Sequence, residues 1–179
     1  MESGYHSALW LDLAPLFADG GRVARFVEPL VVALRPLRVD AVCGPLVGGA
    51  FLAQLVAQAL GVDFWYTERF VPAGATGMYQ VRYLLPPALA AHAAGKRVAM
   101  VDDVMSAGSA LRGTLATVEA HGATAVAAGA LLVLGSVGAT FFAERGIPVV
   151  AVAREEYASW LPADCPLCSE GVPLKQVSD

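Results

Sequence analysis

The sequence predicts an α/β protein in which a mainly parallel sheet is flanked by helices. Three observations support this: short apolar runs alternate with helical patterns, glycine-rich turns separate them, and hydrophobic residues make up 56% of the chain while charged residues make up 16%. Strands covered on both faces read as uninterrupted apolar runs, and strands that alternate with helices form parallel sheets. We expect a single domain over residues 1–179, which is long enough for a substantial core.

The expected elements follow one another in a regular alternation. Residues 22–34 repeat apolar side chains at helical spacing, and Pro36 ends this helix. A short apolar strand over 39–43 leads into the glycine-rich loop 44–49. The remaining assignments are a helix over 50–60, two strands over 63–71 and 78–85 joined by a turn, a helix over 86–94, a strand over 97–101, a helix over 109–121, a strand over 124–134, a helix over 137–144 and a strand over 148–153.

The most informative stretch is residues 98–110, where a buried strand runs into two carboxylates and a loop of small residues. Asp102 and Asp103 follow the apolar segment, and Ser106 to Ser109 precede the next helix. Backbone N–H groups at a helix start favour anions, and small side chains let the backbone approach closely. Ionised carboxylates accept hydrogen bonds from neighbouring hydroxyl groups. The stretch therefore predicts a site for a ribose 5-phosphate.

This stretch resembles the signature with which type I phosphoribosyltransferases bind phosphoribosyl diphosphate (PRPP). Its segment Ser-Ala-Gly-Ser-Ala-Leu-Arg, 106–112, is most similar to the orotate phosphoribosyltransferase branch. The resemblance implies the type I fold, transfer of the phosphoribosyl group to a base with orotate first, Mg²⁺ held through PRPP and water, and a homodimer. It assigns catalysis and the ribose hydroxyls to Asp102 and Asp103, and it assigns PRPP binding to Asp102, Asp103, Val104, Met105, Ser106, Ala107, Gly108, Ser109 and Ala110.

Two segments supply the pyrophosphate contacts that the resemblance implies. The loop 44–49 follows the first strand of the sheet, where its backbone donors can hold pyrophosphate oxygens. The hairpin 64–83 corresponds to the flexible catalytic loop of the family. The implied pyrophosphate residues are Val47, Gly48, Gly49, Arg69 and Arg82, with Arg69 also catalytic. The alternatives are a turn that needs glycine for packing and arginines that are merely solvated.

The two ends of the chain resemble a small hood that covers the base in this family. The hood is expected from about 1–20 and 154–179. The residues implied at the base are Ser3, Gly4, Trp10 and Ser106. Core packing is the alternative for Trp10.

Three positions depart from the family pattern. The position of the pyrophosphate-loop lysine falls close to Gly48, and the hairpin contains no lysine. The strand ending at Leu134 is followed by Gly135-Ser136, where the family has an Asp-Arg pair whose arginine holds the base carboxylate. Two alternatives therefore stay open: a phosphoribosyltransferase for another base, and a non-catalytic regulator that binds PRPP or a nucleotide.

Composition limits the partners and the compartment. A net charge of −4 without a basic block argues against a nucleic-acid surface. Two long uncharged runs, 41–62 and 123–143, each divide into a short strand, a glycine-rich loop and a helix, and this pattern argues against a membrane span. An odd cysteine count of three without a secretory signal predicts reduced thiols in the cytoplasm. Cys165 and Cys168 are at most half of a zinc site. Two cysteines near a chain end more commonly pack or stay solvated without a metal. If they do bind zinc, a symmetric dimer could supply the other two ligands.

Overall fold

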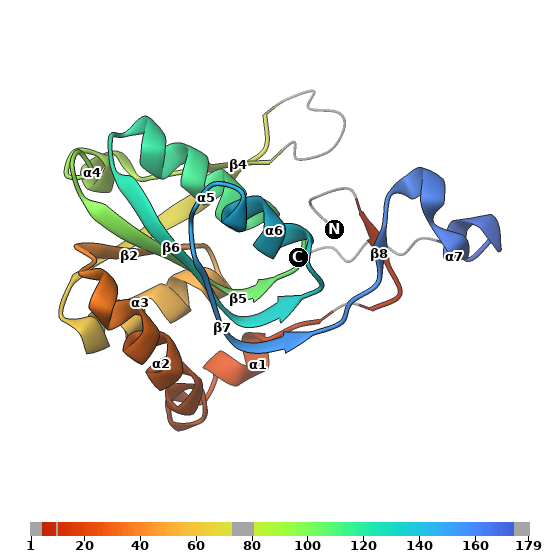
Figure 1. Cartoon of the computed structure of the whole chain (residues 1–179), viewed down its shortest axis with the longest axis horizontal. Helices are drawn as coiled ribbons and strands as arrows, with labels where there is room; N and C mark the ends of the chain where they lie inside the picture. The colour runs from red at the N-terminus through yellow and green to blue at the C-terminus, as the bar shows by residue number, and fades with distance from the viewer. Residues whose placement is uncertain (1–4, 10, 73–80, 174–179) are drawn as a thin grey trace.

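A six-stranded sheet forms the centre of the protein (Figure 1). The computed structural model describes residues 5–9, 11–72 and 81–173. The strand order is β4-β3-β2-β5-β6-β7, and every neighbouring pair is parallel except β3 and β4. The strands are β2 (Ala41–Pro45), β3 (Asp63–Phe70), β4 (Arg82–Leu84), β5 (Arg97–Met105), β6 (Thr124–Leu134) and β7 (Val149–Glu155).

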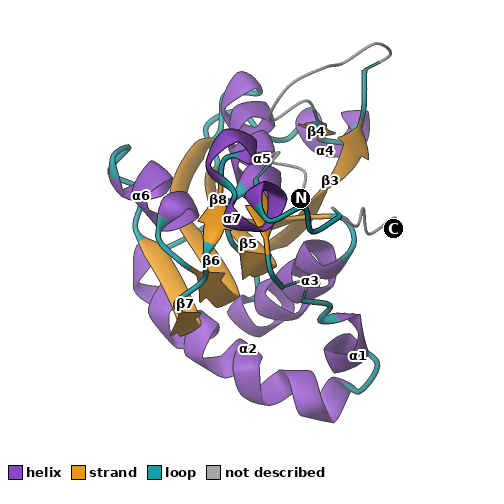
Figure 2. Cartoon of the chain, turned by 90° about the vertical axis from the view of Figure 1, so that its right-hand side faces the viewer, coloured by secondary structure: helices purple, strands orange, loops and turns teal. Residues whose placement is uncertain are grey.

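Helices cover both faces of this sheet (Figure 2). On one face α2 (Gly20–Leu34) and α3 (Gly48–Leu60) pack on the sheet, with the short α1 (Ala14–Phe17) beside them. On the other face lie α4 (Pro87–Ala90), α5 (Ser109–Ala120) and α6 (Val137–Ala143). Each face has its own apolar core, so the inner strands are buried on both sides. None of the described helices is long and apolar enough to cross a membrane.

The chain changes direction across the sheet between β2 and β5. From β2 the chain adds β3 and then β4 on one side, whereas β5, β6 and β7 follow one another toward the opposite edge. The carboxyl ends of β2 and β5 therefore lie side by side, and the connections that follow them lead toward opposite edges of the sheet. In open α/β sheets ligands bind at such a switch point.

Both ends of the chain meet beyond the carboxyl ends of the strands. Strand β1 (His6–Ser7) pairs antiparallel with β8 (Ser159–Trp160), and the one-turn helices η2 (Pro162–Asp164) and α7 (Pro166–Ser169) follow. We call β1, β8, η2 and α7 the terminal unit. Figure 1 shows the terminal unit to one side of the main sheet, past the ends of β5, β6 and β7.

The expected elements occur in the expected order, with corrections at their ends. The strand expected over 97–101 continues to Met105, because residues 102–105 still pair with β6. The helix expected from Ala50 begins at Gly48, and the helix expected over 86–94 is the single turn α4. In the hairpin, β3 pairs with residues 82–84. Its expected tip lies outside the described residues.

Candidate active site

Asp102 and Asp103 are the last acidic residues of β5 and lie within the strand, not after it. Asp102 is buried, with 8% of its surface exposed, and Asp103 is partly buried. The N–H of Asp103 donates to Oδ1 of Asp102 at 3.0 Å, and the N–H of Val104 donates to Oδ1 of Asp103 at 2.8 Å. Backbone donors therefore hold one oxygen of each carboxylate. This fixes the orientation of both carboxylates at the edge of the sheet.

The loop from Ser106 to Gly108 joins β5 to α5 and leaves a helix start open to an anion. Gly108 occupies the position before the helix with φ of 75°, a left-handed conformation that favours glycine. No side chain caps α5, so the first N–H groups of the helix have no partner from a cap. The N–H of Gly138 in α6 donates to the carbonyl of Ser106 at 3.0 Å, which anchors the loop. The arrangement is suited to binding a phosphate.

The start of α3 lies directly against the two carboxylates. A Cβ on Gly48 would lie 2.7 Å from Cγ of Asp103, and a Cβ on Gly49 would lie 2.7 Å from Oδ1 of Asp102. These approaches leave no room for a side chain. Because β2 and β5 are parallel neighbours, the helix start after β2 and the carboxylates of β5 meet at the switch point. The backbone after β2 can therefore share a ligand with the Asp pair.

A cavity of about 480 Å³ lies between α6 and β7, away from the Asp pair. A second cavity, of about 300 Å³, opens at the Asp pair and has a volume that suits a small ligand. It is lined by Leu11, Asp12, Leu13, Asp102, Asp103, Val104, Ser106, Ala107, Gly108, Ser109, Ala110, Leu134 and Tyr157. The predicted phosphate loop is thus brought together with the carboxylates. The side chain of Met105 is turned away into the core.

Five lining residues were not expected as site residues from the sequence: Leu11, Asp12, Leu13, Leu134 and Tyr157. Leu134 ends β6, whereas the other four lie in the two segments expected to form the hood, and the hydroxyl of Tyr157 donates to the carbonyl of Leu9 at 2.7 Å. No motif or periodicity singles out these individual residues, so only the tertiary structure identifies them. Of the residues implied at the base, Ser106 lines the cavity, whereas Ser3, Gly4 and Trp10 lie outside the described residues.

Comparison with known proteins agrees with this geometry. Residues 33–155 match the family model described as a phosphoribosyl transferase domain. This chain belongs to the phosphoribosyltransferase family. As a member it is an enzyme of the pentosyltransferase class, and its fold is the type I fold of that family.

The similar proteins include both pyrimidine and purine enzymes. Orotate phosphoribosyltransferase of Thermus thermophilus is 32% identical over 177 residues, covering 99% of this chain and 90% of that protein. The orotate enzyme of Carboxydothermus hydrogenoformans is also 32% identical, with coverage of 97% and 85%. Among solved structures, the orotate enzyme of Aeropyrum pernix has a TM-score of 0.66 at 24% identity, covering 83% and 80%. Adenine phosphoribosyltransferase of Trypanosoma brucei has 0.67 at 16%, covering 86% and 77%.

The two arginines expected at the pyrophosphate of this phosphoribosyltransferase lie on the β3–β4 hairpin. Pro45 pairs with Thr67, so Arg69 lies two residues beyond the end of β2, and Arg82 pairs with Phe70. Both side chains are exposed at the carboxyl edge of the sheet. Neither they nor Val47, Gly48 and Gly49 belong to the lining of the cavity.

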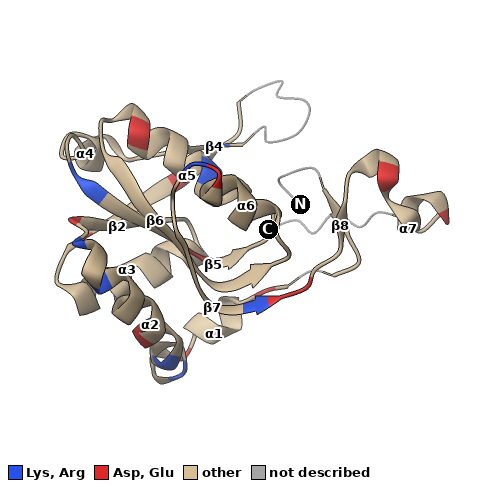
Figure 3. Cartoon of the chain, viewed as in Figure 1, with Lys and Arg blue, Asp and Glu red and all other residues tan. Residues whose placement is uncertain are grey.

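Cations are sparse around the phosphoribosyltransferase site. Figure 3 shows the lysines and arginines of the described residues spread over several elements. Lys96 is the one lysine that the structure describes, and it precedes β5 at the amino end. Asp103 lies seven positions further along the chain, a distance of about 23 Å at the rise of an extended strand. Lys96 pairs with Asp63 at 3.7 Å, so it does not replace the absent loop lysines.

Gly135 follows β6 where the family pattern has a charged pair. It has φ of 65°, and a Cβ there would lie 3.1 Å from the carbonyl oxygen of Tyr157. The segment between β7 and β8 therefore approaches the end of β6 closely, with no arginine between them at this position.

Two cysteines of this enzyme have raised thiol pKa values. Burial in β2 raises the pKa of the Cys43 thiol to about 12. A hydrogen bond with Cys165 raises the pKa of the Cys168 thiol above its usual value, with burial as a lesser cause. Reactive cysteines have lowered pKa values instead, so neither of these two thiols has the character of an activated nucleophile.

Proposed function

We propose that this chain transfers the phosphoribosyl group of PRPP to orotate, forming orotidine 5′-phosphate and pyrophosphate. The observation that carries the proposal is the contact between the carboxylates of β5 and the glycines that begin α3, beside an uncapped helix start. The names of the relatives favour orotate as the base. Pyrimidine biosynthesis is the role that follows from this reaction.

The proposed mechanism divides PRPP among three groups of residues. The backbone from Ser106 to Ser109 holds the 5-phosphate, and the carboxylates of Asp102 and Asp103 accept hydrogen bonds from the ribose hydroxyls. A base nitrogen displaces pyrophosphate at C1 of the ribose. Positive charge that develops on the sugar in the transition state is favoured by the two nearby carboxylates. Phosphate binding far from C1 orients the reacting centre.

The leaving pyrophosphate is held by backbone donors and by the hairpin. The N–H groups of Val47, Gly48 and Gly49 face it, and Arg69 and Arg82 bring guanidinium groups, which bind pyrophosphate oxygens bidentately. Arginine remains protonated, so these side chains supply charge without transferring a proton. We propose Arg69 as the catalytic cation of the loop.

The oxygen donors of the site suit Mg²⁺. This hard cation prefers oxygen ligands, and Asp103 is only partly buried at the cavity, so its carboxylate could accept hydrogen bonds from water bound to the ion. Mg²⁺ would be held through PRPP and water, with no protein side chain bound to it directly, and would neutralise charge on the leaving group.

The described residues of the two chain ends, within 1–20 and 154–179, are proposed to form the hood over the base. Ser3, Gly4 and Trp10, which the resemblance implies at the base, lie outside the described residues. A homodimer is the proposed assembly. Large apolar side chains are exposed on and just before α3, where 63% of the surface of Val47 and 48% of that of Phe51 are exposed. These side chains support a subunit interface at this place.

A base without a carboxylate is the second candidate substrate. Gly135-Ser136 follows β6 in place of the arginine that would hold the carboxylate of orotate. Solved adenine phosphoribosyltransferases share the fold, so the scaffold accommodates purine enzymes. The choice of base therefore depends on the hood, not on the sheet.

The test is pyrophosphate release from PRPP and Mg²⁺ with orotate, uracil, adenine, hypoxanthine or xanthine. We expect orotate-dependent release that falls by about 10²–10³-fold in Asp103→Asn, as for loss of one transition-state contact of about 3–4 kcal/mol. Asp63→Asn is the matched control, because Asp63 begins β3 at the amino ends of the strands, away from the Asp pair at their carboxyl ends. Release with another base instead would refute orotate, and no release with any base would refute the reaction.

A further inference from the structure

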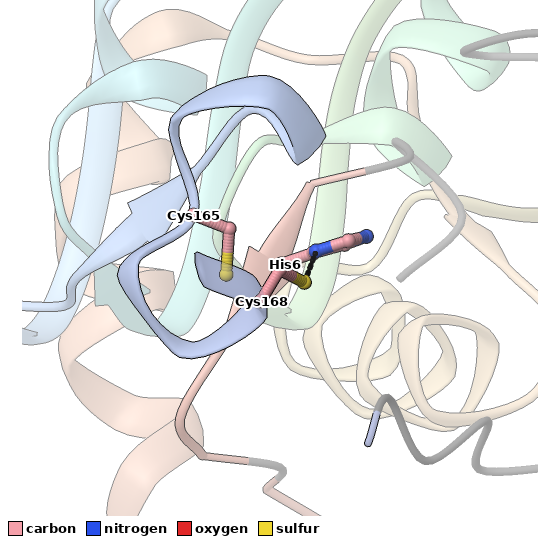
Figure 4. A group of neighbouring side chains, drawn as sticks. All are labelled: His6, Cys165 and Cys168. Atoms are coloured by element: carbon pink, nitrogen blue, oxygen red, sulfur yellow. Dashed lines mark hydrogen bonds between the residues drawn. The ribbon is translucent and has the colours of Figure 1, made fainter. Parts of the chain in front are cut away.

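Three metal-binding side chains meet in the terminal unit. Ligand atoms of His6, Cys165 and Cys168 all lie within 4.8 Å of one another. Figure 4 shows the imidazole from β1 facing the two thiols of the C-terminal segment. Among the described residues, no other group of three or more histidine, cysteine or acidic side chains has this spacing.

The local structure explains why the three side chains converge. Cys165 is the residue before α7 and Cys168 lies within it, three positions later, so both thiols project from the same face of one helical turn. The N–H of Ser169 donates to the carbonyl of Cys165 at 3.2 Å and closes this turn. The pairing of β1 with β8 brings His6 opposite Trp160 and so to the thiols.

We propose that His6, Cys165 and Cys168 bind a zinc ion. Thiolate and imidazole are the ligands that Zn²⁺ takes in proteins, and the two cysteines have the two-residue spacing of zinc sites. Tetrahedral ligands at ordinary Zn–S and Zn–N bond lengths lie about 3.5–3.8 Å apart. The pair His6 Nδ1 and Cys168 Sγ is 3.2 Å apart, so small side-chain movements complete the geometry.

One chain supplies three ligands, so the site does not need a symmetric partner to provide the other half. Cys165 is buried, whereas Cys168 is exposed. Water can occupy a fourth position on the exposed side, as in zinc sites with three protein ligands.

The zinc ion would connect two segments that are far apart in the sequence. His6 and Cys168 are separated by 162 positions. Along the chain, Leu11 to Leu13 follow His6 and Tyr157 precedes Cys165, and these residues line the cavity at the Asp pair. The metal would therefore hold the cavity wall that the chain ends contribute. This inference rests on the terminal unit alone and does not depend on which base the enzyme uses.

The test is the zinc content of the full-length protein purified without chelators. We expect about one zinc per chain in the wild type, less than a tenth in Cys168→Ser, and the wild-type content in Cys43→Ala. Cys168 is exposed, so its replacement should leave the fold intact, while Cys43 is a core thiol outside the cluster. Equal zinc in wild type and Cys168→Ser would overturn the proposal.

A second measurement uses the wild type alone. Co²⁺ added to the metal-free protein should produce thiolate charge-transfer and tetrahedral d–d absorption, and equimolar Zn²⁺ should abolish both. Zn²⁺ should also protect two thiols from alkylation and raise Tm. Absence of the cobalt spectrum, or a Cys165–Cys168 disulfide that forms in air despite added Zn²⁺, would refute the metal site and indicate a dithiol pair.

Discussion

Replacing Gly48 with alanine is the sharpest test of the contact between α3 and the carboxylates. The added Cβ would lie 2.7 Å from Cγ of Asp103 and closer still to its Oδ2. Nonbonded carbon atoms ordinarily approach to about 3.5–4.0 Å, so the carboxylate must retreat by about 1 Å. Retreat breaks the bond of 2.8 Å from the N–H of Val104 to Oδ1.

We expect Gly48→Ala to lower kcat/KM more than it lowers the free energy of unfolding. The carboxylate is the end of a short side chain at the cavity, and it can turn toward solvent while the helix stays in place. A hydrogen bond to a charged group contributes about 1.5–3 kcal/mol. If that amount is lost in the transition state, kcat/KM for PRPP falls roughly 10- to 150-fold. A lysine at this position would meet the same obstruction, so Gly48→Lys should not restore the family pattern.

The assay is steady-state pyrophosphate release at varied PRPP, with thermal unfolding measured in parallel. The matched control is Gly20→Ala, because a Cβ there has nothing within 4 Å and the residue begins α2, which does not line the cavity at the Asp pair. The control should keep wild-type kinetics. A Gly48→Ala enzyme with kcat/KM within twofold of wild type would show that Gly48 is not packed against Asp103 in the working enzyme.

Three further variants or measurements probe other contacts. Thr114→Val should lower the free energy of unfolding by about 1–3 kcal/mol in a denaturant titration, because the buried Thr67 hydroxyl loses its partner at 2.9 Å; an unchanged midpoint would contradict this. Gly108→Ala should weaken PRPP binding in calorimetry, since φ is 75° and a Cβ would lie 3.3 Å from Cα of Gly138; wild-type affinity would exclude a strained cradle. Cys43 should resist alkylation at pH 8 while the exposed Cys168 of metal-free protein reacts, and the free energy of unfolding should fall as pH rises from 9 toward about 12, because only the unfolded Cys43 thiol ionises there; equal labelling of Cys43 and Cys168 would refute the burial of Cys43.

Periodicity and glycine placement predict most of the sheet. Continuous apolar runs identify β2, β5, β6 and β7, since a strand buried on both faces has no polar side to interrupt it. The family comparison confirms the fold class. The strand end at Val101 was wrong because polar Asp102 and Asp103 resemble a loop, although their backbone continues to pair with β6. A polar side chain indicates exposure to solvent, but it does not mark where the backbone hydrogen bonds of a strand end.

Part of the candidate site could likewise be predicted from the sequence, and part depends on the tertiary structure. Residues 102–110 are contiguous, so their sequence alone specifies a carboxylate pair and an anion cradle, and the cavity includes most of them. The contact of Gly48 with Asp103 depends on the parallel neighbours β2 and β5, which no local pattern reveals. His6 is still harder to identify, because it joins Cys165 and Cys168 only through the pairing of β1 with β8.

The pairing of β1 with β8 also sets an order of events during synthesis. His6 leaves the ribosome early, but its partner Trp160 is made more than a hundred residues later. The sheet from β2 to β7 can close beforehand, because all of its strands are complete at Glu155, before β8 begins. A nascent chain can thus acquire its core while the opening beside Asp102 still lacks one wall. Turnover would then begin only once β8 has left the ribosome and paired with β1.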